Sequence, residues 1–219
     1  MTASFVFMKN AKLQLDWWIF GCALFMGLAS LIKAIVSFLD ANEKDSTNRL
    51  VGPLQVLRAQ LNLIEQNADV RLTVHVPNKK GTHLVQAIDY IGNSSRQAKG
   101  TARRKVPVNA GIIGRAFREK EMQIAHRNGD RTEDYLNELV TKWSFDKEAA
   151  AKVDTTARSW VAIPLFAEEE EVVGVLYADS RCPDFFKGRS AVNICYTGAR
   201  GIARTFGCDV PKVTREPED

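Results

Sequence analysis

Apolar residues run almost without interruption from Trp17 to Leu39, where Lys33 is the single charge. A helix of this length rises about 1.5 Å per residue and spans a hydrocarbon core of roughly 30 Å. A cleaved signal peptide would have a shorter apolar core, and a buried or interfacial helix would have a polar face. The pattern therefore predicts a transmembrane helix over residues 17–39.

The rest of the chain divides by composition into an N-terminal flank (1–16), a polar linker (40–48), a globular domain (49–208) and a polar tail (209–219). Basic residues are almost equally frequent on the two sides of the predicted helix, so the positive-inside rule decides little. The cysteines of the globular part are three in number and lack a CxxC pair, which favours a reducing compartment. We therefore expect a single-pass membrane protein with a cytoplasmic globular domain.

Periodicity in the globular part predicts helices and strands in alternation. Apolar residues three and four apart predict helices, and strict alternation predicts strands. In chain order these are a helix from Leu50, strands over 70–76 and 83–91, a helix within 106–121 capped by Asn109, a strand over 122–125, a helix over 132–152, a hairpin over 159–186 and a helix over 188–206. Two antiparallel hairpins separated by helices predict an α+β fold, in which helices cover the faces of an antiparallel sheet.

Four short motifs within these elements resemble those of the GAF domain family. They are Gly-Ile-Ile-Gly-Arg-Ala at 111–116, Ala-Ile-Pro-Leu at 162–165, Gly-Val-Leu at 174–176 and Pro-Asp-Phe-Phe at 183–186. The resemblance covers about Leu50 to Phe206 and implies a GAF-like antiparallel sheet with helices on its faces. A PAS-like sensor fold is the main rival.

The resemblance also implies a function. GAF domains bind small molecules between the sheet and the helices and loops that cover one face, and they commonly dimerise through their terminal helices. We therefore expect a membrane-tethered sensor that binds a small-molecule ligand, forms a homodimer and signals through a separate output protein. The alternative is a ligand-free GAF-fold scaffolding protein at the membrane.

The sequence does not identify a cofactor or a reaction. The motif of the cyclic-nucleotide group is absent, and no cysteine stands beside a histidine as the bilin group requires. Cys195 and Cys208 lie on or after the last predicted helix, away from the loops that carry the cysteines of the methionine sulfoxide reductases. His126 is a lone candidate for a haem ligand. Because no catalytic motif is present either, we expect no enzyme, no catalytic residues and no metal site.

Residues 96–105 form a basic loop that leaves three interpretations open. Arg103 and Arg104 could close over an anionic ligand, lie against anionic lipid, or remain solvated. No aromatic residues are interleaved with these charges, so nucleic acid is not an expected partner.

Candidate ligand-binding residues follow from strand alternation and from large aromatic side chains. Trp160 shares a strand face with Ala162, while Tyr177 and Asp179 are polar groups on an otherwise apolar strand. The full set is Tyr90, Arg103, Arg104, Trp143, Trp160, Tyr177 and Asp179. Asp179 could equally cap the turn that leads to Pro183.

Overall fold

The structure is a computed structural model that describes residues 49–92, 104–127, 131–167 and 171–206, together with Lys33 and Gly129. The described domain belongs to one compact unit, Asp45–Asp219. Apart from Lys33, the predicted transmembrane helix lies outside the described residues, as do the flank, the linker and the tail. Among the described helices, none has the length and apolar character needed to cross a bilayer.

A six-stranded antiparallel sheet forms the middle layer of the domain. Its strands are β1 (Arg71–Pro77), β2 (His83–Gln86), β3 (Lys105–Pro107), β4 (Gln123–His126), β5 (Ser159–Phe166) and β6 (Val172–Ser180). They are arranged in the order β3-β2-β1-β6-β5-β4. The predicted hairpin therefore supplies β5 and β6, which lie beside each other near the middle of the sheet.

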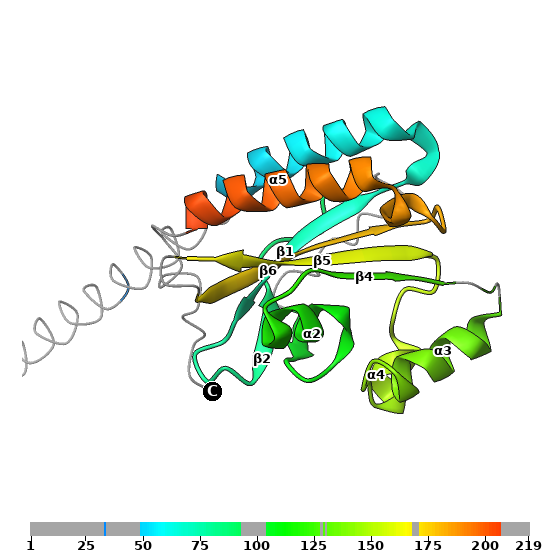
Figure 1. Cartoon of the computed structure of the whole chain (residues 1–219). Coiled ribbons are helices and arrows are strands. Elements are labelled where there is room, and N and C mark those ends of the chain that lie inside the picture. The colour runs from blue at the N-terminus through cyan, green and yellow to red at the C-terminus, as the bar shows by residue number, and fades with distance from the viewer. Residues whose placement is uncertain are drawn as a thin grey trace, which may run out of the picture. The chain divides into compact units, whose positions relative to one another are not determined.

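Helices cover both faces of this sheet (Figure 1). One face carries α5 (Arg189–Phe206) and a helix over residues 49–64, called helix 49–64 below. The other carries α2 (Gly111–Glu119), α3 (Thr132–Thr141) and α4 (Lys147–Ala151). Two short 3-10 helices, η1 (Gln66–Ala68) and η3 (Phe185–Lys187), precede β1 and α5. The observed α+β architecture confirms the predicted fold class of the globular domain.

Each face of the sheet has its own apolar core, because side chains alternate along every strand. Leu72 and Val74 of β1 join the core beneath helix 49–64 and α5. On this side a Cβ on Gly198 of α5 would lie 2.8 Å from the side chain of Leu57, so the glycine allows the two helices to approach closely. The opposite core contains Trp160 and Tyr177, under α2, α3 and α4.

The region before α2 differs in part from the prediction of a helix within 106–121 capped by Asn109. Lys105–Pro107 is the edge strand β3, and the helix starts only at Gly111. Asn109 does not cap it, because the N-cap is Ala110, which makes no side-chain cap bond. The left-handed backbone of Gly111, with φ of 71°, makes the turn from strand to helix.

Two other predicted elements are shorter than expected. The predicted helix over 132–152 divides into α3 and α4, because Ser144 adopts a left-handed φ of 57°. The predicted strand over 83–91 ends at Gln86, whose side chain donates to the carbonyl of Ile88. Thr73 Oγ1 donates to the same carbonyl, and backbone pairing with β1 resumes at the isolated bridge between Leu72 and Ile91.

Candidate functional site

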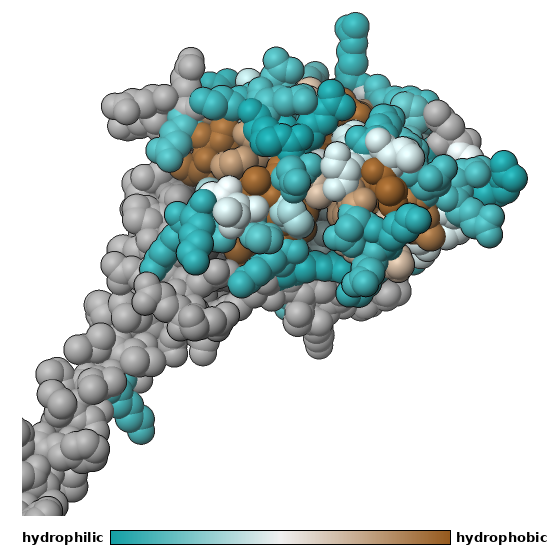
Figure 2. Space-filling view, turned by 90° about the horizontal axis from the view of Figure 1, so that it is seen from below, coloured by the Kyte–Doolittle hydropathy of each residue, from teal (hydrophilic) through white to brown (hydrophobic). Residues whose placement is uncertain are grey.

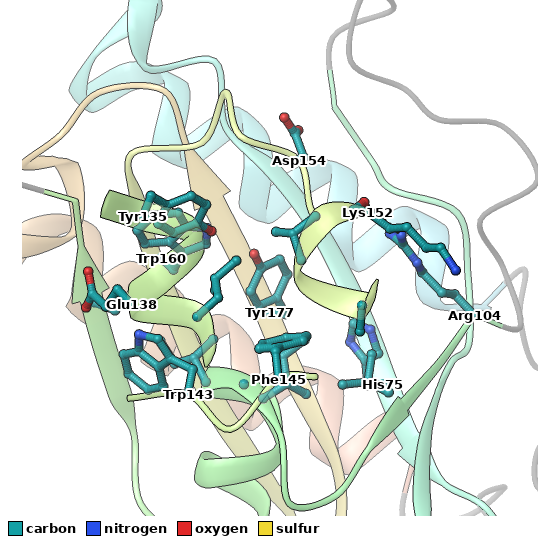
Figure 3. Close-up of a pocket in the computed structure, with 18 of the residues that line it drawn as sticks. His75, Arg104, Tyr135, Glu138, Trp143, Phe145, Lys152, Asp154, Trp160 and Tyr177 are labelled. Carbon is teal, nitrogen blue, oxygen red and sulfur yellow. Dashed lines mark hydrogen bonds between the residues drawn. The ribbon is translucent and has the colours of Figure 1, made fainter. Parts of the chain in front are cut away.

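A pocket of about 770 Å³ lies between the sheet and the layer formed by α2, α3 and α4. β1, β6 and β5 provide its floor, while the α2–α4 layer and the segment around β3 provide its walls (Figure 3). From this side the molecule shows hydrophobic patches surrounded by hydrophilic side chains (Figure 2). The volume of the pocket falls within the range of pockets that hold small organic ligands, roughly 300–1,000 Å³.

An ion pair that is largely excluded from solvent joins β1 to β6 at one end of the pocket. Arg71 Nε donates to both carboxylate oxygens of Asp179, at 2.9 and 2.8 Å. Its Nη2 lies 2.8 Å from Asp154 Oδ2, on the segment that follows α4. The guanidinium also lies 4.3 Å from the centre of the Tyr90 ring, a cation–π distance. Arg71 therefore ties the sheet to the segment that covers the pocket.

The pKa values around this ion pair are displaced from their ordinary values. Burial alone would lower the pKa of Arg71, but the charge and hydrogen bond of Asp179 outweigh it and raise that pKa. Burial and the nearby Asp179 carboxylate raise the pKa of Tyr177 well above its ordinary value. Both side chains therefore stay protonated at neutral pH, and the Tyr177 hydroxyl can donate a hydrogen bond.

Aromatic rings form the central part of the pocket. Tyr177 makes edge-to-face contacts with His75 and Tyr90, with ring centres 6.1 and 6.3 Å apart. Tyr135 of α3 stacks on Trp160 of β5, with centres 5.4 Å apart and planes 7° apart. These contacts link the helical cover to the sheet and offer flat apolar surfaces to a ligand.

His75 is a buried polar group with unused hydrogen-bonding capacity. His75 is 1% exposed, and its Nδ1 has no hydrogen-bond partner among the described residues. Burial, together with the positive charge of Arg104, lowers the pKa of His75 to about 3, so its ring is neutral at pH 7. A buried polar nitrogen without a partner is costly, and a bound ligand could supply the missing bond.

The beginning of α2 shapes the wall near Phe145. A Cβ on Gly111 would lie 2.9 Å from the Phe145 ring, and a Cβ on Gly114 would lie 2.5 Å from the Val108 carbonyl oxygen. The amide of Gly111 donates to the carbonyl of Trp143 at 2.7 Å. The two glycines of the Gly-x-x-Gly motif thus allow α2 to pack closely against both the preceding turn and the segment between α3 and α4.

Basic side chains lie at the rim of the pocket. Arg104 and Lys152 are exposed, and Arg104 Nη2 donates to the backbone carbonyl of Lys152 at 3.3 Å. Neither side chain has a carboxylate partner among the described residues. The positive charge at this rim is therefore available to an anion.

Five of the predicted binding residues line this pocket: Tyr90, Arg104, Trp143, Trp160 and Tyr177. Asp179 is not in the lining, and its carboxylate accepts hydrogen bonds from Arg71 Nε. Arg103 lies outside the described residues. The structure thus brings together residues that are up to 87 positions apart in the sequence, from Tyr90 to Tyr177.

Sequence reasoning missed several lining residues, chiefly Arg71, His75, Tyr135 and Phe145. Arg71 and His75 occupy the polar positions of β1, which the alternation assigned to the solvent side of a half-buried strand. Both are buried, because α2–α4 cover that face of the sheet. The predicted fold already implied this burial, because a central strand has no solvent-facing side in a sheet that helices cover on both faces.

The remaining candidate chemistry gives no further site in the described part of the chain. No group of three His, Cys, Asp or Glu residues there could hold a metal ion. Cys195 is buried in the core beneath α5, and burial raises the pKa of its thiol to about 12. Cys182 and Cys195 are free thiols.

Comparisons with known proteins agree with this architecture. In the solved structures, the chain is similar to a GAF domain/HD domain protein from Geobacter sulfurreducens, at 11% identity and a TM-score of 0.52, over 79% of this chain and 97% of that one. The GAF domain region of a protein from Geobacter sulfurreducens PCA shows 20% identity and a TM-score of 0.49, over 74% and 97% of the two chains. A type II free methionine-R-sulfoxide reductase from Thermoplasma acidophilum shows 12% identity and a TM-score of 0.49, over 77% and 96%.

A family model matches most of the domain described above. The sequence profile of the GAF domain matches residues 52–194, well over half of the chain. The chain therefore belongs to the GAF family, whose domains are typical of ligand-binding sensor and regulatory modules. A comparison with curated proteins finds no match.

Proposed function

We propose that this chain is a membrane-tethered GAF sensor, in which a small organic molecule binds between the sheet and α2–α4. The observation that carries the proposal is the pocket of about 770 Å³, which is lined by His75, a buried residue whose Nδ1 has no hydrogen-bond partner among the described residues. A ligand that bonds to this nitrogen would relieve the cost of its burial. The alternative, a ligand-free scaffold, would gain nothing from such a group.

The cover of the pocket is the element that would respond to a ligand. Polar contacts hold it to the sheet, among them Asp154 to Arg71 at 2.8 Å and Arg127 Nη1 to the Thr155 carbonyl at 3.0 Å. A ligand in the pocket would contact the sheet and the cover together, and so would favour the closed arrangement. Binding would thereby shift the population of cover conformations.

The signal would then pass to a second copy of the chain or to a separate output protein. Val56 and Leu63 of helix 49–64 are 60% and 85% exposed, and they lie seven residues apart on one side of the helix. Apolar residues at this spacing suit helix–helix contact between two copies. The apolar segment 17–39 would hold the dimer at the membrane, with the globular domain in the cytoplasm.

A thermal-shift screen of the full chain in detergent micelles tests ligand binding, because a ligand of the native state raises its melting temperature. The variant Ala149→Trp places an indole where α4 lines the pocket, and Ala151→Trp places one at an exposed position of the same helix. We expect at least one metabolite to stabilise the wild type and the Ala151→Trp variant, but not Ala149→Trp. If no compound stabilises the wild type, or if both variants respond equally, ligand binding in this pocket is refuted.

Carbonate extraction of membranes tests the tether. An integral protein remains in the membrane pellet at alkaline pH, whereas a peripheral protein is released. We expect the full chain to remain in the pellet. Its appearance in the supernatant would contradict the membrane part of the proposal while leaving the ligand part intact.

A further inference from the structure

The pocket changes in chemical character across the sheet. β1 carries His75, which pairs with Gln86 of β2. The backbone N–H of Gln86 in turn donates to the backbone carbonyl of Arg104. Arg104 and His75 therefore lie at the same end. β5, two strands away from β1, carries Trp160 at the other end. Trp160 is in register with Asp179 and Arg71, four residues along β1 from His75, so two strand spacings and this offset separate the two ends by roughly 16 Å.

The close-up shows the same division (Figure 3). His75, Arg104 and Lys152 lie on one side of Tyr177. Tyr135 and Trp160 lie on the other side. The pocket thus has a polar, basic end and an aromatic end, with the Tyr177 ring between them.

Two of the four acidic residues that line the pocket are engaged with cations of the protein. Asp154 pairs with Arg71 at 2.8 Å, and Glu138 Oε1 pairs with Lys142 Nζ at 2.9 Å. The charges of Arg104 and Lys152 have no such partner among the described residues. At the His75 end, a ligand anion would therefore meet two cations that have no carboxylate partner in the described part of the chain, together with a neutral imidazole.

We infer that the ligand is a planar aromatic carboxylate, bound with its carboxylate near His75, Arg104 and Lys152 and with its ring between Tyr177 and Trp160. Rings favour offset or edge-to-face contact with aromatic side chains, and both are presented here. The neutral His75 donates to a carboxylate oxygen through Nδ1, and the guanidinium of Arg104 adds a charge-assisted bond. This inference rests on the proposed function, because it names the chemical class that the same pocket accepts.

A single negative charge fits the rim better than a phosphate dianion. Asp146 and Glu148 line the same pocket, so a second negative charge would be repelled. The first amide of α2, at Gly111, is already bonded to the Trp143 carbonyl and cannot serve a phosphate. A carboxylate needs only the two or three donors that this end provides.

The test is a binding titration of the full chain in detergent micelles with 2-naphthoate, followed by ligand-observed NMR against empty micelles. The comparison probes are 2-naphthamide, 2-naphthylmethylamine, 2-naphthyl phosphate and cyclohexanecarboxylate. We expect 2-naphthoate to bind at least about tenfold more tightly than each of the other four. The amide and the amine lose the charged hydrogen bond, the non-aromatic acid loses the aromatic contact, and the phosphate adds a second negative charge near Asp146 and Glu148. Equal or tighter binding of the amide, the amine, the phosphate or the non-aromatic acid overturns the inference.

Variants assign the binding to the basic end. Arg104→Gln removes an exposed charge at the rim, and we expect it to weaken 2-naphthoate about tenfold. The matched control Arg200→Gln removes an exposed charge from α5, on the opposite face of the sheet, and should change nothing. His75→Phe keeps an aromatic ring beside Tyr177 but removes the hydrogen-bond donor, and it should also weaken the binding of 2-naphthoate. Its melting temperature reports whether this variant folds. An unchanged affinity in Arg104→Gln contradicts the inference.

The outcomes separate this inference from the proposed function. If other metabolites stabilise the chain and Ala149→Trp abolishes their effect, while no naphthyl carboxylate binds, the pocket is a ligand site but not for aromatic acids. If no compound of any class binds, both fail.

Discussion

The Arg71–Asp179 ion pair allows the energetics of the pocket to be tested through stability. Asp179→Asn removes the charge and keeps the size. The side chains are 9% and 0% exposed, and the Nε–Oδ2 distance is 2.8 Å. Neutralising one member of a buried pair costs about 3–5 kcal/mol, because the other charge stays buried. Asp154 and the Tyr90 ring still contact Arg71, so we expect the lower end, about 3 kcal/mol.

For a domain of this size, 1 kcal/mol corresponds to about 2–4 °C, so the melting temperature should fall by about 6–12 °C. The assay is thermal unfolding of the full chain in micelles, followed by near-UV circular dichroism. The control Glu119→Gln breaks an exposed pair with Arg115 on α2 and should shift the melting temperature by less than about 2 °C.

A double-mutant cycle measures the coupling free energy between Arg71 and Asp179. Adding Arg71→Leu to Asp179→Asn should cost clearly less than the sum of the two single changes, because the second change removes the stranded charge. If Asp179→Asn shifts the melting temperature no more than Glu119→Gln does, or if the two changes are simply additive, the ion pair does not hold β1 to β6.

Three further predictions concern packing, dimerisation and pH. Gly114→Ala brings a Cβ within 2.5 Å of a backbone oxygen and should destabilise the domain by about 1–3 kcal/mol in urea unfolding, whereas Gly201→Ala, with nothing within 4 Å, should stabilise it by about 0.5–1 kcal/mol. Combined Val56→Glu and Leu63→Glu should convert the proposed dimer to monomer in sedimentation without lowering the melting temperature. Since the pKa of His75 falls to about 3 on folding, the unfolded chain binds the extra proton below about pH 6.5. Relative to His75→Phe, the wild type should therefore lose about 1.4 kcal/mol per pH unit between pH 6 and 4.5.

The hydrophobic pattern was sufficient to predict most of the fold. Alternation in 70–76 and 159–180 located three central strands, and the apolar spacing of residues 54, 57 and 61 located the helix that covers them. These periodicities reflect burial on one side, which is a local property of the sequence. The two predicted hairpins then indicated the antiparallel arrangement.

Backbone conformation and long-range contacts could not be predicted in the same way. Ser144, between α3 and α4, adopts a left-handed conformation that serine seldom adopts, so its residue type did not indicate a break there. Edge strand β3 has three residues, too few to show alternation. Asp179 was recognised as unusual, but its partner Arg71 lies 108 positions earlier in the chain, and only the folded sheet brings the two together.

The aromatic side of the site was predictable where large side chains stand out against their neighbours. Trp160 and Tyr177 were identified from strand alternation, and both line the pocket. His75 was missed because a histidine in an alternating strand resembles a solvent-facing residue. Its burial depends on α2–α4, which are distant in the sequence.

The central claim is that a small organic molecule binds between the sheet and α2–α4, and hydrogen exchange of the full chain tests it most directly. Peptides covering β1, β6 and the segment from Thr132 to Thr156 should become protected when the small-molecule fraction of a cell extract is added. Ala149→Trp should abolish this protection, and Ala151→Trp should retain it. No protection, or protection confined to helix 49–64 and α5, would contradict the account.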